Sequence, residues 1–359
     1  MKYRHTEIMA AEDITTAGTK TIDINLVDPM SRVSIIVVTR NASWTPTDHP
    51  AKILKSIDLV DGSNVLYSLN GGQCKAMDFF DIGVAAGDEL NFDDNGYSRL
   101  TYHLNFGRKL YDNELAIDPS KFSNLQLKIA HDYALGGGSP DECTLGVYAD
   151  LFDEGRPAFA GFLMSKEIYS VDSVSLQTKY VDLPTDHPIR KLLVMCWHDN
   201  DNCDLTVGHI KLTEEHDKRV LVDTDCQEWI RTHQNRWGKY EEYLCGKSAA
   251  SRAFYVSPHF DIHLALTAND TTALDLAAPW SGGGKRVVDA ATEGEFTGLV
   301  TGTCPFGAVP FAFGDQDVIE DWWDVTRLGS ARLKIIQKEL LTADTSATLD
   351  ALTQQIVRY

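Results

Sequence analysis

Large apolar residues alternate with polar or small ones along much of the chain. The clearest cases are residues 21–26, 100–106, 125–129 and 260–266. This period of two places one face of a strand on a core and the other toward water or a neighbouring strand. Clusters of Gly, Asp, Asn and Ser separate the strands, as at residues 61–64 and 136–140, and predict tight turns. The chain is therefore predicted to be all-β.

Only two segments carry a helical pattern, residues 73–82 and 226–237. In the second, Trp229, Ile230 and His233 recur at helical spacing. Each segment follows a pair of predicted strands, in residues 58–69 and 211–223. Further strands are predicted at residues 168–181, 331–335 and 351–357. We expect one short helix at the same place in each half of the chain.

The order of elements in the front half recurs in the second half. Asp28 and Pro29 lead into an apolar run at 33–38, and Asp186, His187 and Pro188 lead into another at 192–197. Downstream, residues 57–59 match 210–212, and 65–66 match 220–221. The sequence separation between matched segments varies by only a few residues, as expected when only loop lengths differ between the two halves. A β unit used twice favours a structural building block over an enzyme. We place the boundary at Leu183–Thr185, which gives domains 1–183 and 184–359.

The length, net charge and apolar content of the chain limit the kinds of partner that it can bind. The 359 residues are long enough for two cores, but the formal net charge of −19 opposes binding to nucleic acid, which needs clustered Lys and Arg. Lys2, Arg4 and His5 form only a short basic patch, which fits a solvated terminus. No apolar run approaches the roughly 20 residues that span a bilayer, and we expect no signal peptide at the start.

Seven cysteines are scattered along the chain: Cys74, Cys143, Cys196, Cys203, Cys226, Cys245 and Cys304. Their number is odd and none lies in a CxxC pair. This pattern is typical of buried free thiols in a reducing compartment. We therefore expect neither a disulfide nor a tetrahedral zinc site.

Residues 28–80 carry a resemblance to a known family. Asp28-Pro29-x-Ser31-Arg32 precedes a strand, then come PAKIL at 50–54, IDLVDGSNVLYSL at 57–69 and AMDFF at 76–80. This order resembles the double jelly-roll major capsid proteins of tailless icosahedral bacteriophages with an internal membrane, corticovirus-like and related. The closing segment, 328–333 to 356–359, also resembles the family's final strands.

The resemblance implies two eight-stranded jelly rolls side by side, with three chains per pseudo-hexagonal capsomer of a virion shell. The partners would be other copies of the chain, minor capsid or vertex proteins and an inner viral membrane, with assembly in the host cytoplasm and no enzymatic activity. Two alternatives remain. One is a two-jelly-roll glycan-processing hydrolase with acidic residues in the groove between its domains. The other is a cellular tile-like or carbohydrate-binding surface protein.

Three further groups of residues resemble phosphate-binding or zinc-binding motifs. The run Ser281 to Arg286 lacks the glycine and hydroxyl positions of a phosphate loop, so a glycine-rich surface loop is favoured. Two sets of side chains resemble zinc ligands: His259, Asp261 and His263, and Cys196, His198, Cys203 and His209. We favour the polar face of a half-buried strand for the first set and ordinary buried thiols for the second.

Acidic loops and a tryptophan pair complete the candidates. The carboxylates that suit Ca²⁺ are Asp199, Asp201 and Asp204, and Asp88, Asp93 and Asp94. Solvated loops explain them, and a Ca²⁺ ion at a subunit interface is left open. Trp322 and Trp323, flanked by Asp321 and Asp324, suit sugar stacking or a packing anchor, and we favour the anchor. No residue is assigned a catalytic, cofactor-binding or metal-binding role.

Overall fold

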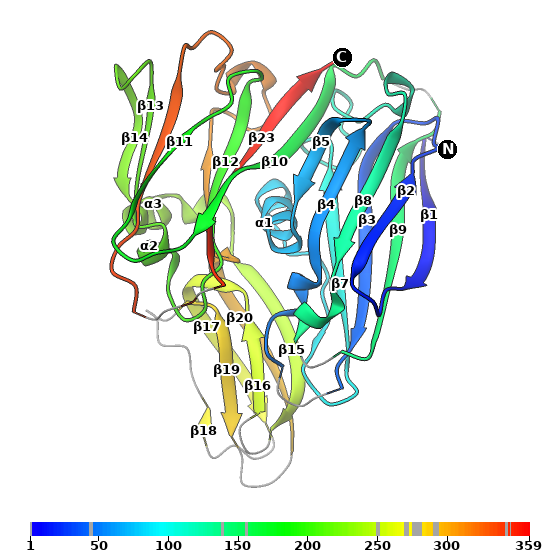
Figure 1. Cartoon of the computed structure of the whole chain (residues 1–359), viewed down its shortest axis with the longest axis vertical. Helices are drawn as coiled ribbons and strands as arrows, with labels where there is room; N and C mark the ends of the chain where they lie inside the picture. Colours follow the sequence, from blue (N-terminus) through cyan, green and yellow to red (C-terminus); the bar gives the residue numbers. More distant parts are fainter. Residues whose placement is uncertain are drawn as a thin grey trace.

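The computed structural model describes residues 2–42, 46–137, 140–154, 157–248, 252–268, 273–274, 282–289, 294–341, 344 and 346–359. Strands dominate, as predicted, and they build two β-sandwiches that stand side by side (Figure 1). No helix in the described ranges has both the length and the apolar character needed to cross a bilayer.

The first sandwich is made of two antiparallel four-stranded layers. One layer has the order β1 (Tyr3–Asp13), β9 (Glu142–Phe152), β3 (Met30–Arg40) and β7 (Tyr97–Asn105). The other has the order β2 (Gly18–Asp23), β8 (Leu125–His131), β4 (Leu54–Asp61) and β5 (Asn64–Leu69). Alternate residues of β3, such as Val33, Ile35 and Val37, are fully buried between the layers. The period of two in the sequence is thus the burial pattern of the strands.

The second sandwich repeats this order strand for strand. One layer has the order β10 (Gly161–Asp172), β23 (Thr348–Arg358), β12 (Ile189–Cys196) and β21 (Ala308–Ala312). The other has the order β11 (Thr178–Asp182), β22 (Ala331–Ile336), β13 (His209–Glu214) and β14 (Arg219–Asp225). The echoed segments therefore occupy matching strands: β3 and β12, β4 and β13, and β5 and β14. The last strand, β23, lies between β10 and β12 in the interior of its layer.

Both predicted helices are present after the matching strands β5 and β14. Helix α1 (Gly71–Ile82) begins at Asn70, whose side chain accepts from the Gln73 amide in a capping box. Helix α3 (Cys226–His233) begins at Asp225 and continues into the 3-10 turn Gln234–Arg236. The sequence did not predict α2 (Cys203–Thr206), a single turn, or the 3-10 turns Pro50–Ile53, Pro119–Lys121, Tyr133–Gly136 and Ile319–Asp321.

The strand pairing divides the chain earlier than the expected boundary at residue 184. Strands β10 and β11 both precede that residue, yet they pair with β23 and β22 of the second sandwich. The change of partners falls between β9 and β10. The sequence echo begins only at the third strand of each unit, which is why it suggested a later boundary. The single strand predicted at 168–181 is also replaced by two strands separated by residues 173–177.

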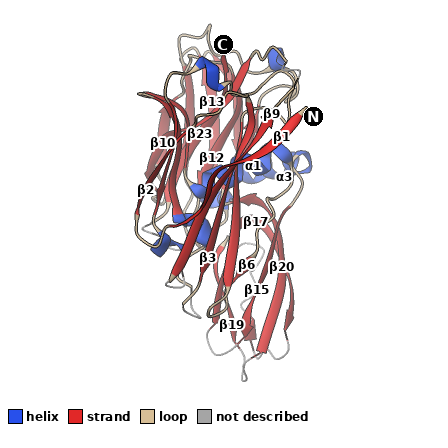
Figure 2. Ribbon diagram, turned by 90° about the vertical axis from the view of Figure 1, so that its right-hand side faces the viewer, coloured by secondary structure: helices blue, strands red, loops and turns tan. Residues whose placement is uncertain are grey.

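A β insertion separates α3 from β21. Its strands are β15 (Tyr240–Ser248), β16 (Arg252–Val256), β17 (Pro258–Ala268), β18 (Ala273–Leu274), β19 (Gly284–Asp289) and β20 (Gly294–Pro305). The strand predicted at 260–266 is β17, and it belongs to this insertion and not to the second sandwich. The short β6 (Leu90–Asn91), from the equivalent connection of the first sandwich, extends the insertion's sheet beside β15. Figures 1 and 2 show the insertion at the end opposite both termini.

The two sandwiches share one continuous sheet. Strand β5 at the edge of the first meets β10 at the edge of the second through a parallel bridge between Ser68 and Lys166. One hydrophobic cluster runs across this junction. It includes Leu193 and Met195 of β12 together with the core of the first sandwich. The two units are therefore arranged head to tail, with the edge strand β5 of the first beside β10, the first strand of the second.

Candidate functional site

Helix α1 fills the seam between the two sandwiches. Ten of its twelve residues are buried. Gly71 and Gly72 permit this close packing, since a Cβ at Gly71 would lie 2.3 Å from the Ala51 carbonyl oxygen and one at Gly72 would lie 2.6 Å from the Trp197 ring. The polar side chains of α1 consequently face protein and not water.

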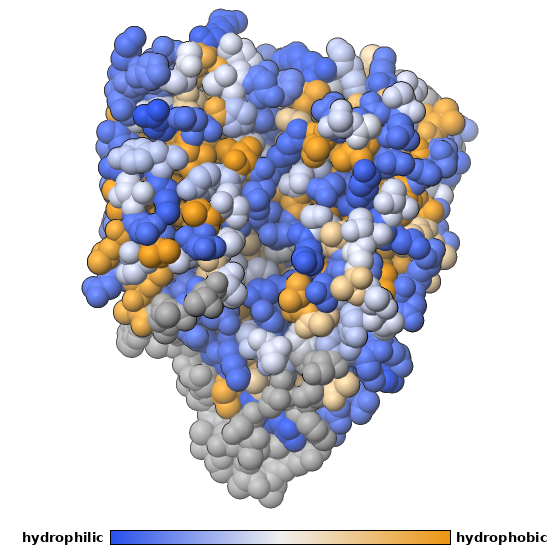
Figure 3. Space-filling model, in the orientation of Figure 1, coloured by the Kyte–Doolittle hydropathy of each residue, from blue (hydrophilic) through white to orange (hydrophobic). Residues whose placement is uncertain are grey.

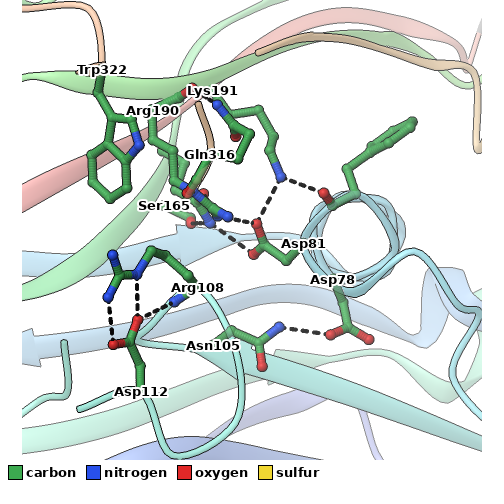
Figure 4. Close-up of polar contacts among 12 residues, drawn as sticks. Asp78, Asp81, Asn105, Arg108, Asp112, Ser165, Arg190, Lys191, Gln316 and Trp322 are labelled. Atoms are coloured by element: carbon green, nitrogen blue, oxygen red, sulfur yellow. Dashed lines mark hydrogen bonds and ion pairs between the residues drawn. The ribbon is translucent and has the colours of Figure 1, made fainter. Parts of the chain in front are cut away.

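Asp81, at the end of α1, binds two cations of β12 (Figure 4). Its Oδ1 accepts from Arg190 Nη1 at 2.6 Å and from Lys191 Nζ at 2.8 Å, and Gln354 Nε2 donates to its Oδ2 at 2.8 Å. Lys191 Nζ also donates to the Phe80 carbonyl at 2.5 Å. Burial by itself would raise the pKa of Asp81, but Lys191 and Arg190 hold that pKa below its usual value. Asp81 is therefore a buried carboxylate.

A second group of acids lines the same seam. Gln73 Nε2 donates to Glu167 at 2.5 Å and to Asp350 at 3.0 Å, and burial raises the pKa of both carboxyl groups. Asp78 accepts from Asn105 at 2.7 Å, and burial raises its pKa to about 7. The raised pKa values favour the protonated forms, which cost less to bury.

Asp78 and Asp350 do not line an open groove, whereas Glu167 is exposed. The exposed fraction is 3% for Asp78 and for Asp350 and 0% for Gln73, and each of the three is bonded to a neighbouring side chain. A glycoside hydrolase needs a carboxyl pair that reaches a sugar in solution. Asp78 and Asp350 therefore belong to a packed junction and are out of reach of such a ligand.

The side chains of the first candidate zinc set, His259, Asp261 and His263, do not gather around one point. His259 is fully buried, with Nδ1 2.6 Å from the Ser257 carbonyl oxygen and Nε2 3.0 Å from that of His198, and burial lowers its pKa to about 4. His263 is exposed. The strand alternation that would align them is broken by a bulge between Phe260 and His263, where Asp261 has φ 52°.

The second candidate zinc set was Cys196, His198, Cys203 and His209. The two cysteines are buried, and His198 Nδ1 lies 3.3 Å from Asp201. His209 contacts Asp223 at 2.8 Å and is partly exposed. Within the described ranges no cluster of three or more His, Cys, Asp or Glu side chains is placed to hold a metal ion.

Two of the carboxylates considered for Ca²⁺, Asp88 and Asp201, accept hydrogen bonds from protein groups. Asp88 accepts from Lys75 Nζ at 2.6 Å and from the Thr101 amide at 3.0 Å. Asp201 accepts from the Leu341 amide at 3.1 Å. Ca²⁺ between copies of the chain stays a prediction.

Trp322 and Trp323 are packing anchors. They are 3% and 9% exposed, and their Nε1 atoms donate to the Asp315 carbonyl at 3.1 Å and to Glu214 at 2.6 Å. Neither ring presents a face for sugar stacking. Trp323 packs in the core of the second sandwich, and Trp322 packs in a small cluster with Leu115 and Leu163.

The glycine-rich run packs against another loop. Ser281 lies outside the described residues, but a Cβ at Gly284 would meet Asp199 at 2.6 Å, and the Asn200 amide donates to the Gly283 carbonyl at 3.1 Å. At the N-terminus, Arg4 pairs with Asp28 at 2.7 Å.

All seven cysteines are free thiols, and all but Cys245 are buried.

Comparisons with known proteins find likeness in structure alone. No family model matches the sequence, and no curated protein matches it significantly. A structure of the Sulfolobus turreted icosahedral virus aligns with a TM-score of 0.61 at 10% identity, covering 100% of this chain and 91% of that chain. The major capsid protein of bacteriophage PM2 aligns with a TM-score of 0.54 at 8% identity, covering 99% and 98%. The PBCV-1 virus capsid gives 0.55 at 9% identity, covering 99% and 93%.

The fold is a double jelly roll. This confirms the predicted fold class and the resemblance to the double jelly-roll capsid class. The phage PM2 protein is no more similar than the Sulfolobus virus or PBCV-1 structures, so the likeness shows the shared fold and does not single out the corticovirus-like subgroup.

The seam residues were not singled out from the sequence. Arg190 and Lys191 do stand inside the echoed segment, as two adjacent cations at the start of an otherwise apolar strand. Such cations need a buried partner. That signal pointed to an ion pair, but Asp81 is 109 positions away along the chain.

Asp78 should make stability depend on pH. Because its pKa is raised from 3.8 to about 7, the folded state holds more protons than the unfolded state between those values, and stability falls as pH rises through them. We predict that Asp78→Asn stabilises the protein above pH 7, by up to about 4 kcal/mol. The measurement is urea unfolding at several pH values.

Asp112→Asn is the matched control. Asp112 is buried and binds Arg108 through both oxygens, at 2.7 and 2.8 Å, and its pKa is lowered despite the opposing effect of burial. This substitution should destabilise the protein at neutral pH, with a difference that shrinks as pH falls below 3.8. Destabilisation by Asp78→Asn at alkaline pH would contradict the prediction.

Loss of the seam carboxylate should be costly. Asp81→Asn leaves Arg190 and Lys191 buried without a counter-charge, which we expect to cost about 3–5 kcal/mol of unfolding free energy. Asp324→Asn removes an exposed partner of Arg327 and should change little. Equal effects of the two substitutions in denaturant unfolding would show that the seam pair does not hold the sandwiches together.

Proposed function

We propose that this chain is the major capsid protein of an icosahedral virion, and that it works by self-assembly and not by turnover. The likeness to solved viral capsid proteins supports this, because it covers nearly the whole of this chain and of each matched chain. A shared module alone would leave a large part of one chain unmatched.

The observation that carries the proposal is the junction inside the chain. Strand β5 and helix α1, on one flank of the first sandwich, meet β10 and β12 of the second. The two sandwiches have the same strand order, so the second has an equivalent flank in β14 and α3. That flank meets no third sandwich in the chain. A second copy, offering its first sandwich, supplies the missing partner.

The open flank has the surface that such a contact needs. Strands β14 and β21 border an apolar hollow of about 340 Å³, lined by Leu221, Val222, Trp229, Phe311 and Phe313 among others. On the first sandwich, the proposed acceptor, Ile36 and Val38 are half-buried on the outward face of β3. Apolar residues at both surfaces favour burial on association.

Head-to-tail contacts of this kind close into a ring if the rotation permits. Three chains with two similar sandwiches each would give six similar corners, which is a pseudo-hexagonal capsomer. Neighbouring capsomers, minor capsid or vertex proteins and an inner viral membrane are the further partners we propose. The site of assembly would be the host cytoplasm, and the final location the virion shell.

The outer surface agrees with a soluble building block. On the described part of the face in Figure 3, apolar residues are interspersed with hydrophilic ones across both sandwiches. The formal charge of −19 opposes close approach of copies. Salt, or Ca²⁺ at an interface, should therefore favour assembly by screening the repulsion.

We predict a homotrimer in solution, detected by light scattering after gel filtration. Val220, on β14, is 45% exposed on the open flank. Val220→Asp should dissociate the trimer, because it places an acid in an already acidic interface. Added salt should restore part of the association.

Val174→Asp is the control, since Val174 is 42% exposed but lies after β10, away from the β14 flank. It should leave the trimer intact. A wild-type protein that stays monomeric in salt and Ca²⁺ would refute the capsomer proposal and favour the hydrolase or surface-protein alternatives.

A further inference from the structure

An open hollow lies where the insertion meets the first sandwich. Its volume is about 390 Å³, within the range of small-molecule sites. Strands β6, β7, β15 and β20 all contribute to its lining. The site is separate from the seam, where α1 covers the acids, and from the β14 flank that the proposed capsomer uses.

Two exposed tyrosines border this hollow. Tyr243 of β15 is 63% exposed, and Tyr97 of β7 is 49% exposed. Tyr97 is held in place, because its hydroxyl donates to Glu142 at 2.8 Å and the Arg40 guanidinium lies 5.9 Å from its ring centroid. Exposed aromatic rings on rigid strands lose little entropy on binding a ligand.

Polar groups surround the rings. Glu89, Asn91 and Thr297 line the same hollow, and the side chain of Glu89 is 70% exposed. Buried Leu90 and Leu244 lie beneath them. A flat apolar surface edged by carboxylate and amide acceptors suits a ligand with an apolar face and hydroxyl donors.

A second hollow adjoins the first. It measures about 370 Å³ and shares Asp88, Leu90 and Tyr243 with the first. Val84, 66% exposed, and Glu241 also line it. Tyr243 therefore borders two adjoining spaces, which give room for more than one ring of a ligand.

We infer that this surface binds a neutral saccharide of two or more rings, with a pyranose face against Tyr243 and hydroxyl groups on Glu89 and Asn91. The carboxylates and the overall charge of −19 disfavour acidic sugars. Sugar stacking, which the sequence analysis disfavours at Trp322 and Trp323, is thus proposed for two tyrosines instead. The inference goes beyond the coat-protein proposal and does not depend on it.

The test is saturation-transfer NMR on the full-length protein with maltose, lactose and sialyllactose. We expect transfer to at least one neutral disaccharide and weaker transfer to sialyllactose, which adds a carboxylate to lactose. Tyr243→Ala should weaken binding about tenfold, which corresponds to about 1.4 kcal/mol.

Tyr180→Ala is the matched control, because Tyr180 is 61% exposed on β11, outside both hollows. It should leave binding unchanged, and circular dichroism should show both variants folded. Absence of transfer, or equal transfer after Tyr243→Ala, would overturn the inference. So would a Tyr243→Ala protein that loses its oligomeric state while no sugar binds, since the hollow would then be an interface between copies.

Discussion

The position of the two sandwiches depends on one buried carboxylate and the two cations that it binds. Asp81 leaves the first sandwich on α1 and contacts Arg190 and Lys191 on β12 of the second. Lys191 is fully buried, so its charge has no access to water. A buried ion pair adds little net stability compared with apolar packing, but losing one partner is very costly. The interaction thereby fixes which surfaces meet, more than how tightly they meet.

Because of this constraint, the two sandwiches differ in which flank is covered. One flank of the first sandwich is fixed against the second, so the corresponding flank of the second remains open. The helix ends also differ in charge: α1 ends with Asp78 and Asp81 in the seam, whereas α3 carries Arg231 and His233 in its last turn. A contact between copies would thus follow the geometry of the internal seam but use different charges. That difference would keep the internal and external junctions distinct during assembly.

Local patterns predicted the strands well, because a period of two requires only neighbouring residues. The echo of Asp28 and Asp186 correctly identified β3 and β12 as equivalent strands. It misplaced the division of the chain, because β10 and β11 lack recognisable counterparts in β1 and β2 and precede the echo. The insertion was also missed: 260–266 has an ordinary strand pattern, and only its pairing with β20 shows that it lies outside the second jelly roll. The Asp81 contacts were out of reach because they join residues that only the fold brings together.

We propose that the internal seam is a template for the contacts of a threefold capsomer. Negative-stain electron microscopy of the purified protein tests it most directly, since class averages show both the outline and the number of subunits. We predict plates with a pseudo-hexagonal outline and threefold symmetry, whose six corners are the six sandwiches of three chains. Isolated particles with only two sandwiches, under salt conditions that screen the acidic surface, would contradict the account.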